Sequence, residues 1–310
     1  MPLRQGFAIG QLTVLELTGK DRNKILNNLC TQDLRTLESG QVRETFVLDV
    51  KGRTLAHGTV AALEDRSWFI SVPDLGEILV PHIDRYIIRE DAVVRDASEE
   101  WNGFLFAPSE QNDPALPWSV TSDSDCSSLT DSSGIAVRTP WLGQGTTLVL
   151  PHHGEKSTII DDLAGCTIPS NCKTRAGWEA HRIRAFWPWY GVDIDSKNLP
   201  QEISIDARAI SFKKGCYLGQ ETVARLDALG QVQKRLVAVQ FEADPGWSFN
   251  DKTEILNGDQ SIGSITSAAP LSSSPNGPNE WIGLAFLKRG VGNIEQGLNP
   301  PFRRIQLGNK

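Results

Sequence analysis

Long hydrophobic runs are missing from this chain. No stretch approaches the roughly 20 consecutive apolar residues that a transmembrane helix needs. The first nine residues have neither an apolar core nor an arginine-rich amphipathic pattern, so they do not read as a targeting segment. These absences predict a cytoplasmic protein that has no membrane partner.

Cysteine is scarce. There are five, at positions 30, 126, 166, 172 and 216, and none of them forms a C-x-x-C pair. An odd number without that spacing argues against a disulfide framework and gives no zinc-binding pattern, so we predict no resident metal site. Reduced thiols in a reducing compartment are the simplest interpretation.

Positive charge is also in short supply. The chain has 31 Lys and Arg against 38 Asp and Glu, a formal net charge of −7, which argues against an extended nucleic-acid surface. A phosphate-binding P-loop and the patterns G-x-G-x-x-G, G-x-S-x-G and H-E-x-x-H are all absent. The usual signatures of nucleotide-binding, serine-hydrolase and zinc-protease sites are therefore missing.

The first hundred residues carry the pattern of a mixed domain. The 310-residue chain is 39% hydrophobic, which is enough for two or three domains with their own cores. Period-two alternation and turn residues predict strands, and helical spacing predicts helices that begin near Asp21 and Asp74. This order predicts an α+β fold with mainly antiparallel sheets. The predicted strands cover residues 12–17, 42–50, 54–62, 68–72, 93–94 and 104–106.

The composition and the predicted secondary structure change twice in the rest of the chain. Residues 108–133 are rich in Ser, Asp and Pro and predict a loop or insertion. Two strands (135–137, 146–150) and two helices (157–163, 175–186) are predicted next. Beyond Lys234 come short strands separated by turns, which predict a small C-terminal β-barrel. We therefore predict one region over 1–235, made of two subdomains, and a barrel over 236–310. The barrel strands are predicted at 236–241, 253–256, 263–266, 281–286 and 303–307, with a loop at 268–279.

The run from Lys213 to Glu221 concentrates reactive groups, because it holds two lysines, two glycines, a thiol, a phenol and a carboxylate within nine residues. A positive charge near a thiol favours the thiolate, so Lys214 is a candidate for activating Cys216. Glycines permit unusual backbone geometry and a close approach of other groups. A buried structural cysteine in a tight turn is the alternative interpretation.

This run resembles the K-G-C-Y-x-G-Q-E signature of the YgfZ family of folate-binding proteins. Other stretches along the chain are similar to that family's motifs as well, and only the 108–133 segment falls clearly outside the resemblance. They are G-x-D-R within 17–22, T-x-D-L within 29–34, D-x-K-G-R within 48–53, Y-G-x-D-I at 190–194, L-P-Q-E at 199–202 and G-x-I-T-S at 263–267.

The family is related to the aminomethyltransferase (T-protein) of the glycine cleavage system. The resemblance implies that fold, with a tetrahydrofolate pocket, and a role in assembly or repair of iron–sulfur proteins that indirectly supports tRNA modification. It implies an accessory factor more than an enzyme, with iron–sulfur client or assembly proteins as partners and a transient iron–sulfur species on the thiol. The implied site residues are Cys216 and Lys214 for chemistry, Asp33, Trp178, Arg182, Tyr217, Gln220 and Glu221 for the cofactor, and Gly215 and Gly219 for the backbone.

Two departures from T-protein bear on function. Its catalytic Asp has no counterpart in the stretch 55–59, which contains no carboxylate. Its pterin-binding Glu, in an R-x-E-A-G pattern, is replaced by Arg184, two residues after Arg182. The departures disfavour the first alternative function, a folate-dependent one-carbon transferase. A second alternative is an interaction module that keeps the fold and has lost folate.

Overall fold

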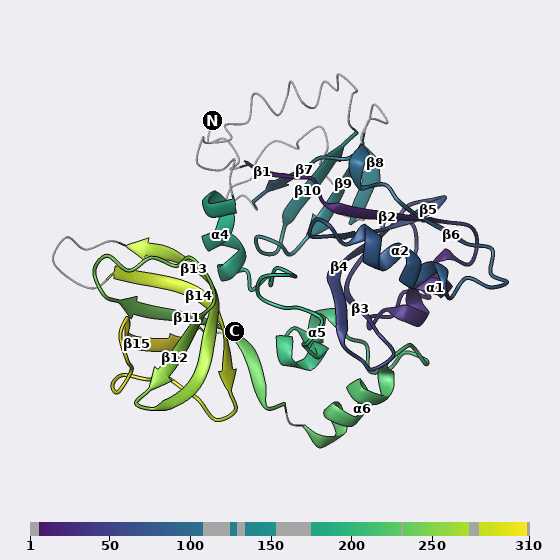
Figure 1. Ribbon diagram of the computed structural model, residues 1–310. Coiled ribbons are helices and arrows are strands. Elements are labelled where there is room, and N and C mark those ends of the chain that lie inside the picture. Colours follow the sequence, from purple (N-terminus) through teal and green to yellow (C-terminus); the bar gives the residue numbers. More distant parts are fainter. Residues whose placement is uncertain are drawn as a thin grey trace.

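The computed structural model describes residues 6–107, 125–128, 134–152, 175–230, 232–272 and 279–308. Three five-stranded sheets lie within this part of the chain, and all their strand pairings are antiparallel. Two sheets form the N-terminal part of the molecule, and the third lies beside them (Figure 1). The prediction of helices combined with antiparallel sheets is confirmed.

The first sheet has the strand order β3-β4-β5-β2-β6 and carries two helices. Its helices bury their apolar residues against it, as the helical spacing of Ile25, Leu26 and Leu29 predicts. The elements are β2 (Thr13–Thr18), α1 (Arg22–Leu29), β3 (Val42–Leu48), β4 (Thr54–Ala62), β5 (Arg66–Ser71), α2 (Gly76–Asp84) and β6 (Val93–Asp96).

The second sheet has the order β1-β7-β10-β9-β8. Its edge strand β8 lies inside the segment predicted as a loop, so that prediction is wrong at this point. The strand forms because it pairs with β9 and because the Cys126 thiol is buried against the carbonyl of Ala62 at 3.3 Å. The predicted helix over 157–163 lies outside the described residues. The elements are β1 (Gly6–Gly10), η1 (Ser98–Glu100), β7 (Gly103–Phe106), β8 (Cys126–Ser128), β9 (Gly134–Thr139) and β10 (Thr146–Pro151).

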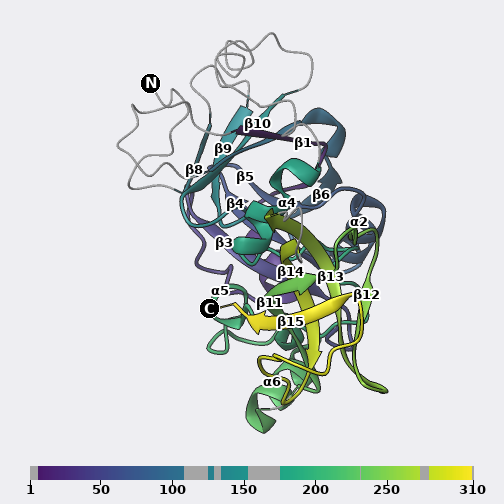
Figure 2. The same cartoon turned by 90° about the vertical axis from the view of Figure 1, so that its left-hand side faces the viewer.

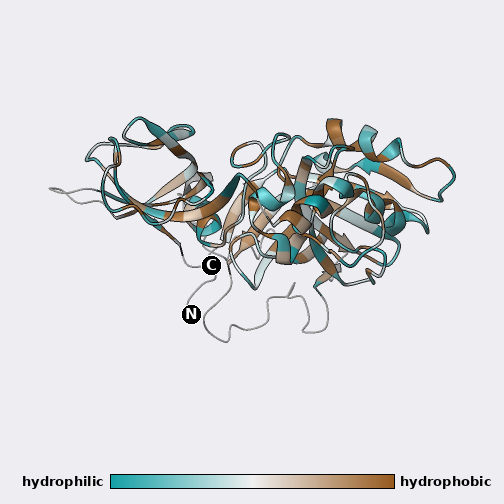
Figure 3. Cartoon of the chain, turned by 90° about the horizontal axis from the view of Figure 1, so that it is seen from below, coloured by the Kyte–Doolittle hydropathy of each residue, from teal (hydrophilic) through white to brown (hydrophobic). Residues whose placement is uncertain are grey.

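The third sheet, with the order β12-β13-β14-β11-β15, is a lobe beside the N-terminal part (Figure 3). No ladder joins its edge strands β12 and β15 in the described residues, so the sheet is a curled half-barrel and the predicted closed barrel is not confirmed. β13 also runs further than expected, into the predicted loop at 268–279. The strands are β11 (Lys234–Ala243), β12 (Thr253–Asn257), β13 (Gln260–Ser272), β14 (Asn279–Lys288) and β15 (Phe302–Leu307).

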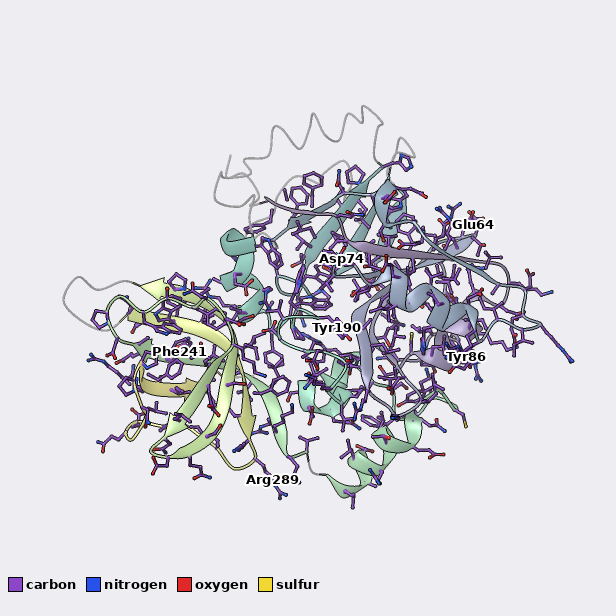
Figure 4. All side chains as sticks on the ribbon, in the orientation of Figure 1. Glu64, Asp74, Tyr86, Tyr190, Phe241 and Arg289 are labelled. Atoms are coloured by element: carbon purple, nitrogen blue, oxygen red, sulfur yellow. The ribbon has the colours of Figure 1, made fainter. Side chains whose placement is uncertain are left out.

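The segment between the N-terminal sheets and the third sheet is mostly helical. Its elements are α4 (Arg175–Arg184), η3 (Pro200–Ile203), α5 (Asp206–Ala209) and α6 (Gln220–Leu229). α4 packs against β13 and β14 (Figure 2), and α5 packs against β3. Tyr190, labelled at the centre of Figure 4, donates its hydroxyl hydrogen bond to the carbonyl of Thr54 at 3.2 Å. The segment therefore contacts both parts of the molecule. The predicted domain boundary at 235 stays a prediction.

A buried ionic network, which we call the Asp193 joint, fastens the third sheet to this segment. Asp193 and Arg182 are both completely buried, with Arg182 Nη1 2.7 Å from Asp193 Oδ2. The other carboxylate oxygen of Asp193 accepts hydrogen bonds from the hydroxyls of Thr266 and Ser267 on β13, at 2.7 and 2.6 Å. The Y-G-x-D-I and G-x-I-T-S motifs, more than seventy residues apart, therefore meet at one carboxylate.

The guanidinium of Arg182 is saturated. Its Nε and Nη2 bind the carboxylate of Glu179, Nη1 also donates to the carbonyl of Trp187 at 3.0 Å, and Nη2 donates to Ser267 Oγ at 2.6 Å. All five N–H groups of an arginine are used by these contacts and the one to Asp193. A buried ion pair whose members are fully hydrogen-bonded holds a fixed geometry, and it is costly to break from one side.

Replacing Asp193 with Asn should therefore destabilise the protein strongly. The substitution leaves Arg182 buried with one carboxylate where it had two, and the expected loss is about 3 kcal/mol in the free energy of unfolding. Denaturant unfolding followed by tryptophan fluorescence measures it. The matched control is Asp227→Asn on exposed α6, which should change stability by less than about 0.5 kcal/mol. Equal stability of the two variants would contradict the joint's structural role.

Candidate functional site

Cys216 lies in the loop between α5 and α6, and its side chain is exposed. Cys30 and Cys126 are buried, and burial raises the pKa of their thiols to about 12 and about 11. Cys166 and Cys172 lie outside the described residues. Within the described part of the chain, Cys216 is therefore the thiol that an external group can reach.

Residues 211–219 form the loop around Cys216, which we call the motif loop. Backbone hydrogen bonds hold this loop against the end of α1. Its Ser211 N–H donates to the Thr31 carbonyl at 3.0 Å, and its Leu218 N–H donates to the Asn28 carbonyl at 2.8 Å. The structure thus brings the T-x-D-L stretch, which follows α1, against the K-G-C-Y stretch, about 185 residues later.

The second glycine of the motif is required by packing. Gly219 has φ +74°, and a Cβ added there would lie 2.5 Å from the carbonyl oxygen of Asp49 and 2.7 Å from Gly52 Cα. Only glycine permits this backbone angle together with this close approach. At Gly215 an added Cβ would meet only Arg35 Nη2, at 3.5 Å, which is an ordinary contact. The close approach at Gly219 therefore fastens the motif loop to the D-x-K-G-R turn at 49–53.

Lys214 anchors the motif loop through its ammonium group. Its Nζ donates to the carbonyls of Asn27, Cys30 and Gln32, at 2.7, 2.8 and 2.7 Å. The last carbonyls of a helix lack intrahelical partners and carry partial negative charge, so a cation that caps them is favourable. Lys214 thereby becomes the C-terminal cap of α1, while Cys216 two residues later stays exposed.

The electrostatic surroundings of Lys214 are those of a half-buried amine. Burial lowers the pKa of Lys214 to about 8, while the Cys30 thiol and the Asp33 carboxyl act in the opposite direction. The positive charge in turn lowers the pKa of the Cys30 thiol against the larger effect of burial. Activation of Cys216 by Lys214 stays a prediction.

The other motif side chains mostly stabilise the turn. Gln220 Oε1 accepts the N–H of Tyr217 at 3.1 Å, and the Tyr217 ring lies 4.8 Å from the Lys214 ammonium. Burial raises the pKa of Tyr217 to about 12. Glu221 is exposed on the first turn of α6, and no ion pair joins it to Arg225 in the described structure. Asp33 accepts the N–H of Arg35 at 3.1 Å.

The remaining two predicted site residues lie in the interior. Trp178 is 3% exposed, with its ring centroid 5.0 Å from that of Trp189. Arg182 belongs to the Asp193 joint, and its donors are already used by Glu179, Asp193, Ser267 and Trp187. No contact joins Trp178 or Arg182 to the motif loop in the described residues, and their role in cofactor binding stays a prediction.

The sequence reasoning missed a buried carboxylate next to His57. Glu44 on β3 places Oε1 2.8 Å from His57 Nε2, and Arg208 Nε lies 3.0 Å from its other oxygen. The stretch 55–59 has no carboxylate of its own, so this one arrives from the neighbouring strand. Strand alternation gives no signal for it, because every residue of β3 from Glu44 to Leu48 is buried, on both faces of the strand. His57 is 1% exposed and Arg208 neutralises Glu44, so the pair is a structural element.

A groove lies beside Arg184, the residue that stands in place of T-protein's pterin-binding Glu. Its volume is about 710 Å³, and it runs between the end of α4, α5 and β11. Among the described residues that line it, three are arginines, Arg184, Arg208 and Arg235, and none is acidic. A pterin edge that donates N–H groups needs an acceptor, whereas guanidinium groups only donate. The lining residues therefore do not fit a pterin bound in the manner of T-protein.

Comparison with known proteins gives a consistent result. No protein-family model matches the chain. It is 25% identical to the mitochondrial iron–sulfur cluster assembly factor IBA57 homolog of Neosartorya fischeri, over 90% of this chain and 64% of the relative. It is 22% identical to the tRNA-modifying protein YgfZ of Vibrio vulnificus strain YJ016, over 76% of this chain and 70% of that protein. The chain is therefore similar to the proteins named IBA57 and YgfZ, in agreement with the resemblance seen in the sequence.

The fold agrees with this assignment. The crystal structure of the glycine cleavage system aminomethyltransferase T from Bartonella henselae superposes with a TM-score of 0.72 at 12% identity, over 99% of this chain and 85% of that one. The T-protein-like fold expected from the sequence is confirmed. Against two fungal relatives of the YgfZ/IBA57 family, the chain spans 64% and 58% of their lengths. In the described residues, no helix is long and apolar enough to cross a membrane.

Replacing Lys214 with Met tests the anchor. The variant loses three hydrogen bonds and leaves the carbonyls at the end of α1 unpaired, so the free energy of unfolding at neutral pH should fall by about 1–3 kcal/mol. Amide hydrogen exchange in the motif loop should accelerate. Lys213→Met, at the exposed neighbouring position, is the matched control and should leave both quantities unchanged.

The difference in the free energy of unfolding between the wild type and Lys214→Met should depend on pH with a defined sign. Between about pH 8 and about pH 10.4, an unfolded lysine keeps a proton that folded Lys214 has released. The unfolded state then binds more protons, so the stability of the wild type should rise relative to Lys214→Met as the pH increases through this window. A difference that stays constant would mean that the amine is not buried as described.

Proposed function

We propose that this protein is an accessory factor for iron–sulfur protein assembly or repair, and that Cys216 is its functional thiol. The observation that carries the proposal is the contrast between an exposed cysteine and the anchored loop that presents it. The role in iron–sulfur assembly is supported by the similarity to fungal proteins named as iron–sulfur cluster assembly factors. The thiol assignment is supported by the position of Cys216 in the motif loop.

A thiolate is a soft ligand that suits iron. Coordination forms a bond from the sulfur lone pair to iron, and the thiol proton is released to solvent. In this chain, the anchored backbone fixes where the sulfur sits, and exposure lets a second protein reach it. Phe212, 48% exposed in the same loop, offers such a protein an apolar contact.

One thiolate does not hold a cluster alone, because four-iron and two-iron clusters normally take four ligands. The described residues contain no group of three or more His, Cys, Asp or Glu side chains able to hold a metal. We therefore assign the remaining ligands to a partner, either an iron–sulfur client or an assembly protein. The cluster is cargo in this scheme, and the protein needs no turnover of a small substrate.

Binding of tetrahydrofolate is implied only by the resemblance to T-protein and to the YgfZ family of folate-binding proteins. The described lining of the groove beside Arg184 contains no carboxylate to accept the N–H groups of a pterin, so no step of the proposed role passes through folate. The same lining disfavours a one-carbon transferase. A link to tRNA modification, named for the Vibrio relatives, would be indirect, through iron–sulfur enzymes that modify tRNA. The cytoplasmic location stays a prediction.

Replacing Cys216 with Ala should remove function and leave the fold intact. The expected change in the free energy of unfolding is within about 0.5 kcal/mol, because the side chain is exposed. The functional readout is the activity of a four-iron client enzyme in cells that depend on this protein, which should fall to the level of the empty vector.

Cys30→Ala provides the matched control, for which we expect the opposite result: lower stability and retained client activity. It removes a buried thiol, so stability should fall by about 1 kcal/mol while client activity survives. A Cys216→Ala protein that unfolds readily would support the structural interpretation of this thiol. Full client activity with Cys216→Ala would contradict the proposed function.

A further inference from the structure

An exposed cation lies beside the exposed thiol. Arg35 directly follows the T-x-D-L stretch, and its Nη2 lies 3.5 Å from the position that a Cβ would take at Gly215. Because consecutive Cα atoms are about 3.8 Å apart, the guanidinium lies within about 9 Å of Cys216 Cα. The side chains of Arg35 and Cys216 are both exposed. A protein that binds at Cys216 is therefore within reach of a second contact from Arg35.

The charge of Arg35 is not used by the fold. Its guanidinium forms neither an ion pair nor a side-chain hydrogen bond with any described residue. Asp33 is close in sequence, but its Oδ1 accepts the backbone N–H of Arg35, at 3.1 Å. Besides burial, which is the larger cause, the positive charge of Arg35 lowers the pKa of the Lys214 ammonium. Arg35 thus repels another cation of this surface, and an anion bound to it would offset that repulsion.

The backbone that carries Arg35 is held in place. The N–H of Leu34 donates to Asn27 Oδ1 at 3.0 Å, which fixes the turn before Arg35 to α1. The Lys214 ammonium donates to the carbonyls of Asn27 and Gln32, so the motif loop is tied to the same turn. With both backbones ordered in advance, binding a ligand here costs mainly the ordering of side chains.

Gly215 leaves the space beside the cation and the thiol open. It does not have a positive φ, and a Cβ added there would make only an ordinary contact with Arg35. Packing within the described residues therefore does not require glycine at this position. The missing side chain instead leaves the backbone accessible, which lets an incoming chain approach closely beside Arg35 and Cys216.

We propose that Arg35 is a specificity-determining residue of this site and binds a carboxylate that the iron–sulfur partner carries next to its own cysteine ligand. Arginine recognises carboxylates through paired, charge-assisted hydrogen bonds. The chain as a whole has a net charge of −7 and repels acidic proteins, so a local cation selects where an acidic face can dock. The inference rests on the proposed function of Cys216 and adds the chemistry by which the partner is recognised.

The test uses two synthetic peptides of equal length with one cysteine each, flanked by Glu in one peptide and by Gln in the other. Each cysteine is activated as a mixed disulfide with 2-thiopyridine. The Cys216 thiolate attacks the peptide's sulfur and forms a new disulfide, while the bond to the pyridine sulfur breaks and its electron pair leaves as pyridine-2-thiolate, which takes up a proton. Absorbance of the released thione gives the rate constant, and the Cys216→Ala protein gives the background from other thiols.

The acidic peptide should react about 10-fold faster than the neutral peptide at low ionic strength, and this preference should shrink as salt is added. Arg35→Gln should remove most of the preference and leave the rate of the neutral peptide unchanged. Arg35→Lys, which keeps the charge, should restore most of it. Lys252→Gln, at an exposed position just before β12, is the matched control and should react like the wild type.

The inference is overturned if the wild type reacts with both peptides at the same rate, or if Arg35→Gln keeps the preference. It is also overturned if a single-stranded RNA oligonucleotide blocks the reaction more strongly than a cysteine-free acidic peptide does, because the cation then serves a nucleic acid. These reactions involve neither iron nor a client enzyme. A lost preference together with lost client activity in Cys216→Ala would overturn this inference alone, whereas client activity that survives Cys216→Ala would overturn the proposed function.

Discussion

The Asp193 joint is the interaction on which the architecture depends. One carboxylate receives a guanidinium from α4 and two hydroxyls from β13, and all of these groups are buried. The joint ties the third sheet to the segment that also carries α5, α6 and the motif loop. Losing any one hydrogen bond or ion pair of such a network is costly in free energy, because it leaves a buried charge or dipole without a partner. It therefore fixes the position of the third sheet, which supplies one wall of the groove beside Arg184, here called the arginine groove.

The motif loop uses a different device for a different purpose. The Lys214 ammonium donates three hydrogen bonds to carbonyls at the end of α1. Gly219, which has no Cβ, allows the motif loop to pack closely against the turn at 49–52. These contacts immobilise the backbone on both sides of Cys216 while the thiol itself stays in solvent. This arrangement suits a thiol that binds a group on a second protein. Because the backbone is already ordered, little conformational entropy is lost when the partner binds.

The exposed thiol and the arginine groove belong to separate parts of the fold. Cys216 lies beyond α5 on the side of α1, whereas the groove is formed by the end of α4, α5 and β11. α5 (Asp206–Ala209) contributes to both, because the Thr31 hydroxyl donates to the carbonyl of Ala209 and Arg208 lines the groove. The motif loop and the groove thus share one short helix, α5.

The sequence by itself determined the antiparallel α+β class, most strands, the resemblance to the YgfZ family and the motif around Cys216, because periodicity and motif spacing are local properties. Only the tertiary structure decided the rest. It placed Arg182 in a buried network with Asp193 and paired the Lys214 ammonium with carbonyls at the end of α1. It also brought Glu44 to His57 from another strand and formed β8 within a predicted loop. Each of these depends on partners far away in sequence, and hydrogen-bonding capacity alone does not say which partner a buried polar group will meet.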